Sequence, residues 1–224
     1  MSISLPDAVL AIGSLGAASF ALVDSSKAVR GGVSNLGFGH VEQVLDRLFP
    51  PGVDKADRSN ALTFAGVLGT LRANWLNGRS LADQKSIAKT LIKLRLDATN
   101  AAHLAAATGV DPAVLASLAA KYATGGALSP EEQNVAGRFD LLLTTLLEEG
   151  YERADQAYRN GAKAVAGVVA VVLAVLGKLA LGDPAIGWGM ALLAGFLAAP
   201  LAPVSKDLAS ALQASVKALQ IVRT

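Results

Sequence analysis

The chain has 224 residues, of which 52% are hydrophobic and only 17% are charged, and its net charge at pH 7 is +2. Typical soluble proteins carry about 25% charged residues, and a net charge this close to zero gives no global field that would attract nucleic acid. Since the chain has no cysteine, disulfides, thiol catalysis and cysteine-ligated metal sites are excluded.

The first predicted element is a transmembrane helix within residues 1–23. Ala8–Val23 is an uncharged run, and Asp7 before it suits a helix N-terminus. The residues before the run contain no Lys or Arg, so the segment does not resemble a cleaved signal peptide. We expect an uncleaved span here, with a buried or interfacial helix as the alternative.

Residues 24–163 have an ordinary soluble charge content, with 16 Lys and Arg and 15 Asp and Glu. Every strong periodicity in this segment is helical, which predicts an all-α cytoplasmic domain without strands. The expected helices are Val41–Phe49, Ala56–Leu76, one capped by Ser80 and ending at Leu94, one from Asp97 to Ala107, one from Asp111-Pro112 to about Ala123, and one starting at Ser129-Pro130.

The last of these helical patterns continues to Arg159 and leads into an apolar run. If it is unbroken, the helix exceeds about 50 residues, with Gly150 and Gly161 as possible bends. Upstream, the glycine-rich segment 31–39 lacks a phosphate-binding pattern and is interpreted as a hinge beside the membrane.

A basic run is the one charged feature above background. Lys85, Lys89 and Lys93 recur every four residues and form a stripe opposite Ile87, Leu91 and Leu94 on the predicted helix. The stripe is either a solvated face or a contact surface for anionic lipid or for the acidic 131–155 helix of a neighbouring subunit. The full set of candidate contact residues is Arg72, Arg79, Lys85, Lys89, Lys93 and Arg95.

No catalytic, cofactor-binding or metal-ligating residues are expected. The two histidines, His40 and His103, stand far apart and have no second ligand at suitable spacing, and no calcium-loop pattern occurs. We therefore predict that the protein is not an enzyme and uses no cofactor.

The segment 164–204 predicts a transmembrane helical hairpin. Ala164–Leu181 is apolar except for Lys178, Gly182-Asp183-Pro184 forms a turn, and Ala185–Val204 is an uncharged run of 20 residues. With the first span, this gives a membrane protein with three transmembrane helices. Lys and Arg flank the first span on its C-terminal side, precede the second and follow the third, so the positive-inside rule places the N-terminus outside and the C-terminus inside.

Small residues recur every four positions on each predicted span. Such positions share one helix face and allow close helix approach in lipid, either within one chain or between protomers. The predicted packing or oligomer-interface residues are Gly13, Ala17, Ala166, Ala170, Ala174, Gly187, Ala191 and Gly195.

Residues 205–224 form a predicted C-terminal amphipathic helix. The sequence as a whole predicts a homo-oligomeric membrane assembly, a scaffold or a pore, in the inner membrane of a bacterium. Its expected partners are membrane lipid and further copies, with other protein subunits as a further option and no nucleic acid. The alternatives are a soluble protein that buries the 164–204 hairpin and inserts to form a pore, or an accessory subunit of a transport or secretion complex.

Overall fold

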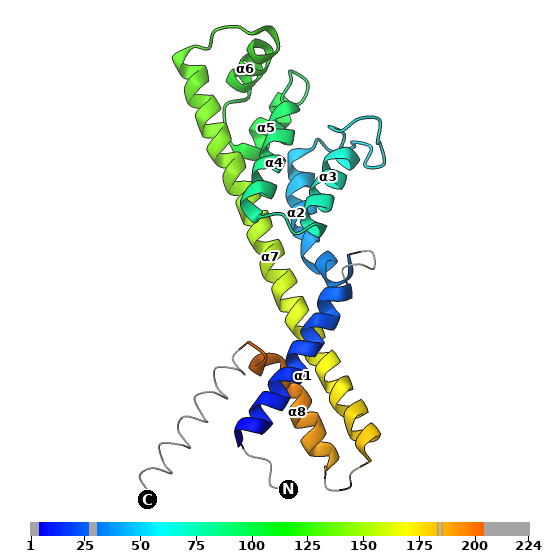
Figure 1. Cartoon of the computed structure of the whole chain (residues 1–224). Coiled ribbons are helices and arrows are strands. Elements are labelled where there is room, and N and C mark those ends of the chain that lie inside the picture. Colours follow the sequence, from blue (N-terminus) through cyan, green and yellow to red (C-terminus); the bar gives the residue numbers. More distant parts are fainter. Residues whose placement is uncertain (1–4, 27–30, 183, 185, 204–224) are drawn as a thin grey trace, which may run out of the picture. The chain divides into compact units, whose positions relative to one another are not determined.

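The computed structural model describes residues 5–26, 31–182, 184 and 186–203, and every regular element in these residues is a helix (Figure 1). This confirms the all-α class. The predicted C-terminal helix 205–224, together with Lys27, Arg30 and Asp183, lies outside the described residues. The chain divides into two compact units, one formed by Ser34–Tyr158 and one by the segments before and after it. We call them the charged unit and the apolar unit.

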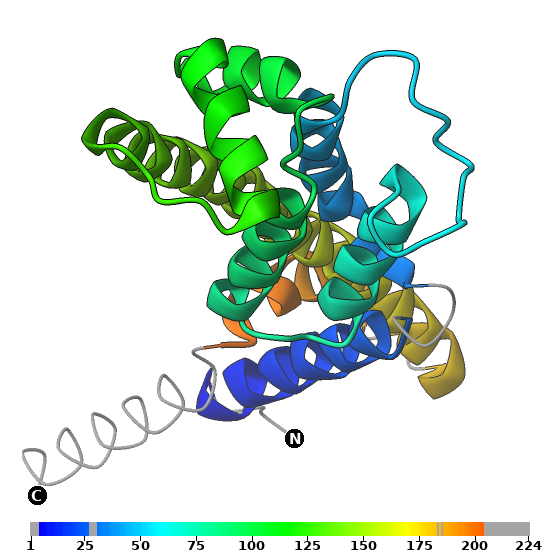
Figure 2. The ribbon, with the colours of Figure 1, turned by 90° about the horizontal axis from the view of Figure 1, so that it is seen from above.

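The charged unit contains five complete helices and the first part of a sixth. The helix α5 packs against α6 and α2, and α3 packs against α2 and α4 (Figures 1 and 2). The bounds are α2 Asn35–Leu48, α3 Phe64–Leu76, α4 Leu81–Leu94, α5 Ala101–Thr108, α6 Pro112–Thr124 and α7 Pro130–Leu181, of which the residues up to Tyr158 belong to this unit.

Three predicted helix starts are confirmed by their caps. The Ser80 hydroxyl accepts the Asp83 N–H at 3.1 Å, and the Asp111 carboxylate accepts two N–H groups of the first turn of α6. At α7, the Ser129 hydroxyl accepts the Glu132 N–H while the Glu132 carboxylate accepts the Ser129 N–H at 2.7 Å. This reciprocal pair is a capping box, and it satisfies two donors that a helix start otherwise leaves free.

The predicted start of α3 at Ala56 is wrong, because short polar side chains hold the preceding chain in turns. The carboxylate of Asp57 and the amide of Asn60 each accept an N–H two residues ahead. The helix begins at Phe64, where the Thr63 hydroxyl caps the Gly66 N–H. The same applies to the helix that was expected to start at Asp97. The Asp97 carboxylate accepts the N–H groups of Thr99 and Asn100, so α5 begins only at Ala101.

The expected hinge at 31–39 is partly helical. The helix α2 begins at Asn35, and Gly37 lies in it against α7, where an added Cβ would meet the carbonyl oxygen of Ala154 at 2.1 Å. This glycine permits close packing of two helices. Gly150 has a similar role, because its position on α7 faces Val44 and does not break the helix.

The helix α4 packs Ile87 and Leu91 of the apolar stripe against the core, but its most buried face is displaced from that stripe. Its buried residues are Gln84, Ala88 and Ile92, whereas Leu94 is 64% exposed. The buried positions lie between the apolar stripe and the lysine stripe on the helix surface. The helix is therefore rotated about its axis so that its lysines reach a neighbouring helix. The period of the sequence pattern alone does not predict this rotation.

The apolar unit contains α1 (Leu5–Ser25), the part of α7 from Arg159 onward, and α8 (Trp188–Leu201). By length and composition two helices in the described part of the chain, α1 and α7, are able to cross a membrane, and α8 is an apolar helix of only 14 residues. The prediction of three spans is therefore wrong for the third. The chain at Gly187 is extended, and the helix ends at Leu201 directly after Pro200, so residues 186–187 and 202–203 of the predicted run lie outside the helix.

Glycine allows the helices of the apolar unit to approach to backbone contact. A Cβ added to Gly16 of α1 would lie 2.0 Å from the carbonyl oxygen of Ala198 of α8. A Cβ added to Gly195 of α8 would lie 2.6 Å from the Cα of Val171 of α7. Because the contacted atoms belong to the backbone, neither position has room for a larger residue without separating the helices.

We predict that Gly16→Ala lowers the unfolding temperature of the purified protein, because α1 and α8 must move apart. The matched control is Gly177→Ala, a helical glycine of α7 whose added Cβ meets nothing within 4 Å. Alanine there should be neutral or stabilising by up to about 1 kcal/mol, since it is the better helix former. Equal effects of the two substitutions in thermal unfolding followed by circular dichroism would contradict this packing.

Candidate functional site

The lysine stripe of α4 contacts acidic residues of α7 in the same chain. The Lys85 ammonium donates to Glu148 at 2.6 Å and approaches Glu152 at 3.5 Å, and those of Lys89 and Lys93 donate to Asp140 at 3.1 and 3.0 Å. The two helices thus form a ladder of ion pairs. The sequence indicated an acidic helix as a possible contact of the stripe, in a neighbouring subunit, and the structure brings the stripe to that helix within one chain.

The ion pairs shift the pKa values of their members in the direction that favours charge. The hydrogen bond from Lys93, with a second from Lys89, lowers the pKa of Asp140, and the hydrogen bond to Glu148 raises the pKa of Lys85. Asp140 is therefore a stable carboxylate already matched by two cations. Such a group is poorly suited to act as a general base at neutral pH.

The other candidate basic residues do not join the ladder. Arg72 donates to the side-chain amide of Asn35 at 2.6 Å, and Arg79 is exposed. The guanidinium of Arg95 lies 3.5 Å from the centre of the Phe49 ring, a cation–π contact. The predicted set of six is thus divided among four different environments.

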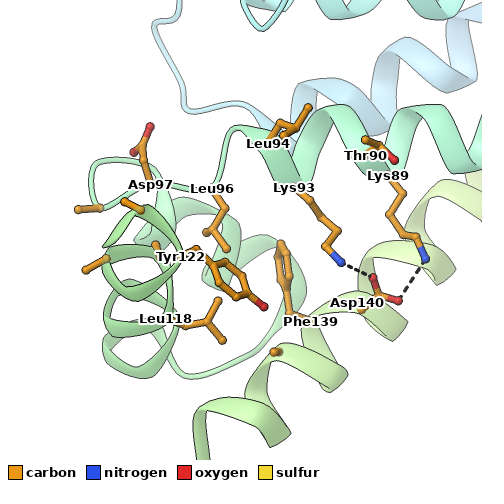
Figure 3. Close-up of a pocket in the computed structure, with 15 residues that line it drawn as sticks. Lys89, Thr90, Lys93, Leu94, Leu96, Asp97, Leu118, Tyr122, Phe139 and Asp140 are labelled. Atoms are coloured by element: carbon orange, nitrogen blue, oxygen red, sulfur yellow. Dashed lines mark hydrogen bonds and ion pairs between the residues drawn. The ribbon is translucent and has the colours of Figure 1, made fainter. Parts of the chain in front are cut away.

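A pocket of about 740 Å³ lies beside the ladder, between α4, α6 and α7. Figure 3 shows Leu118, Tyr122 and Phe139 turned toward this space, while Lys89 and Lys93 point to Asp140 at its edge. The volume lies within the range of roughly 300–1,000 Å³ that is usual for small-ligand sites. The pocket has an apolar floor and an edge whose lysine and aspartate charges are already paired. Sequence reasoning missed it because its walls come from three separate helices.

The described residues contain no cluster of three or more His, Asp or Glu side chains that could hold a metal ion. His103 lies 3.0 Å from the carbonyl oxygen of Arg47, and this contact links α5 to α2.

The apolar unit has small residues inside and large apolar residues outside. Of the predicted packing residues, Gly13, Ala166, Ala170, Ala191 and Gly195 are buried, Ala174 is half-buried, and Ala17 and Gly187 are exposed. The outer surface carries large side chains, which include Leu10, Leu22, Val168, Val172, Leu176, Leu179, Trp188, Met190, Leu193 and Phe196. Soluble proteins show the reverse distribution, with large apolar side chains among the most buried.

Lys178 lies where the end of α7 meets the start of α8. Its ammonium group donates to the carbonyl oxygen of Ile186 and lies 5.0 Å from the centre of the Trp188 ring. The position of Lys178 in the last turn of α7 agrees with the sequence. Its two contacts could not be predicted, because they depend on how α8 lies against α7.

Comparisons of the chain with known protein families, with curated proteins and with solved structures gave no match.

We predict a loss of stability in acid that depends on Glu132. A hydrogen bond from Lys121, with further ones from the Ser129 N–H and the Ser117 hydroxyl, lowers the pKa of Glu132 to about 2. Because the pKa is lower in the folded than in the unfolded state, its stabilisation is complete above about pH 4.3 and is lost as the pH falls toward 2. Thermal unfolding is measured between about pH 5 and about pH 2, a range that spans the pKa of Glu132 in the unfolded and in the folded state. The unfolding temperature should fall more steeply with pH in the natural protein than in Glu132→Gln.

The control for this experiment is Glu131→Gln, which removes a neighbouring acid for which no ion pair occurs among the described residues. It should leave the slope unchanged. Parallel slopes for Glu132→Gln and the natural protein would show that the α6–α7 ion pair does not control acid stability.

Proposed function

We propose that the protein is an integral membrane protein in which the apolar unit is the anchor and the charged unit is a non-enzymatic interaction module at the membrane surface. The observation that carries this proposal is the distribution of side chains in the apolar unit, where glycine and alanine face inward and leucine, valine and phenylalanine face outward. Water penalises such a surface and hydrocarbon does not.

The same distribution favours an anchor over a soluble protein that shields its hairpin. A shielded hairpin requires the apolar helices to be buried, yet only 11% of the most apolar 18 residues of α7 are buried. In α1 the corresponding share is 22%. A core helix of a soluble protein is mostly buried, so these values support contact with lipid.

We further propose a scaffold rather than a channel within one chain. The backbone contacts of Gly16 with Ala198 and of Gly195 with Val171 close the three helices against one another at these positions. A pore would therefore need several copies. The proposed orientation places residues 24–163 in the bacterial cytoplasm, because Arg153, Arg159 and Lys163 precede the apolar part of α7.

We predict that the protein stays with the membrane pellet after extraction at high pH, which releases peripheral proteins, and that it enters solution only with detergent. Fractionation of expressing cells followed by immunoblotting measures this. Release of the full chain at high pH, or a monodisperse protein in detergent-free buffer, would contradict insertion in lipid.

Homo-oligomers are the second part of the proposal, and exposed small residues support them. Ser14, Ala17 and Ala18 lie on the exposed side of α1, where small side chains leave room for another helix. Gly195 is not a suitable position to test this interface, because substitution there would meet Val171 within the chain.

We predict that Ala17→Leu reduces the size of the oligomer in mild detergent, because the added bulk blocks close approach of a second copy. Light scattering coupled to size-exclusion chromatography measures the mass. Ala180→Leu, at an exposed position of α7, is the matched control and should leave the mass unchanged. If Ala17→Leu also leaves it unchanged, that face of α1 is not a subunit contact.

A further inference from the structure

An apolar groove with a single cation lies within the apolar unit. It has a volume of about 520 Å³ and runs between α1, the end of α7 and α8, with Ala8, Ala11 and Leu15 on one side and Leu173, Gly177 and Met190 on the others. Among the residues that the structure describes, Lys178 is the only charged one that lines it. The volume is in the range of about 300–1,000 Å³ found for small-ligand sites.

Lys178 retains hydrogen-bonding capacity in this setting. An ammonium group has three N–H donors, and among the described residues the Lys178 ammonium donates only to the carbonyl oxygen of Ile186. No carboxylate of the described chain lies within ion-pair distance of it. The contact with the Trp188 ring holds the side chain near the turn between α7 and α8.

We propose that the groove is a binding site for an anionic phospholipid, with one acyl chain in the groove and the headgroup phosphate on the Lys178 ammonium. This inference rests on the proposed membrane insertion. An apolar channel that ends at one cation, for which the described residues supply no carboxylate partner, matches a molecule with a long apolar chain and one anionic end. Basic positions between membrane helices bind lipid headgroups for the same reason.

The size of the effect follows from the single charge. A Lys near an anionic lipid surface contributes about 1 kcal/mol, which corresponds to a roughly fivefold preference for an anionic over a zwitterionic headgroup. The acyl chain adds affinity without headgroup selectivity. The charge and the groove therefore make separable contributions that two kinds of substitution can test.

Trp188 is a built-in reporter for the site, because its ring lies 5.0 Å from the Lys178 ammonium. The full chain is reconstituted in phosphatidylcholine vesicles that contain a small share of either brominated phosphatidylglycerol or brominated phosphatidylcholine. Bromine quenches nearby tryptophan fluorescence. The chain has two tryptophans, and the signal of Trp188 is obtained by subtracting that of the Trp188→Phe variant, which retains only Trp75.

We expect brominated phosphatidylglycerol to quench Trp188 about fivefold more effectively per molecule than brominated phosphatidylcholine. Lys178→Gln should abolish the difference and Lys178→Arg should retain it. The matched control is Lys163→Gln, which removes an exposed cation from the same helix and should also retain the difference.

A second pair of variants tests the groove. Ala11→Leu places bulk in it, whereas Ala180→Leu adds the same bulk at an exposed position of α7 that does not line the groove. Quenching by brominated phosphatidylglycerol should fall in the first variant and persist in the second. Equal effects of the two substitutions would contradict occupancy of the groove by an acyl chain.

The outcomes separate this proposal from the proposed function. Equal quenching by the two lipids in the natural protein would overturn the lipid site and leave membrane insertion intact, and a second copy in the groove would give this result. A preference that persists in Lys178→Gln would likewise overturn it. Quenching by neither lipid would overturn membrane insertion and the lipid site together.

Discussion

The helix α7 packs against other helices in both units and continues between them without a break. It therefore has to form ion pairs in the charged unit and close apolar contacts in the apolar unit. In the charged unit it accepts close contact from α2 at Gly150 and Ala154 and ion pairs from α4 and α6. In the apolar unit it packs against Gly195 of α8. Its 52 residues rise about 78 Å as one hydrogen-bonded helix. Along α7 the residues that contact other helices change from acidic to small and apolar. This change determines whether the neighbouring helix supplies cations or small residues at the contact.

The two units use different means to hold helices together. In the charged unit, buried leucine, phenylalanine and tyrosine side chains form the core, and exposed ion pairs such as those of Lys85 add roughly 0.2–1 kcal/mol each. In the apolar unit, the interior consists of Gly13, Ala166, Ala170 and similar residues. Dispersion between closely approaching backbones replaces burial of large side chains there, and large side chains are left for the outer surface.

Much of the fold could be read from local signals. Ser80, Asp111 and Ser129 were identified as helix starts because an oxygen side chain precedes a helical pattern, and such caps act through neighbouring residues only. The start of α3 was missed because alanine and leucine after Asp57 fit a helix as well as a turn. The length of the third span was overestimated, because hydropathy is independent of backbone conformation. Here the backbone is extended at Gly187, and α8 starts only at Trp188.

The candidate sites were harder to anticipate, because they depend on contacts between helices distant in sequence. The spacing of Lys85, Lys89 and Lys93 matched that of Asp140 and Glu148 on a later helix, but no local rule states that the two helices are neighbours. The pocket beside Tyr122 and Phe139 has the same origin. The contacts of Lys178 with Ile186 and Trp188 likewise depend on how α8 lies against α7, not on the composition around the lysine.

The short length of α8 has a consequence for the lipid around it. Its 14 residues rise about 21 Å, less than the roughly 30 Å of a typical hydrocarbon core. Under the proposed insertion, the bilayer beside α8 must become thinner, or polar headgroups must bend inward to meet the helix ends. Such mismatch costs a fraction of a kcal/mol per Å, so the protein would partition toward the thinner regions of a membrane and would itself create them.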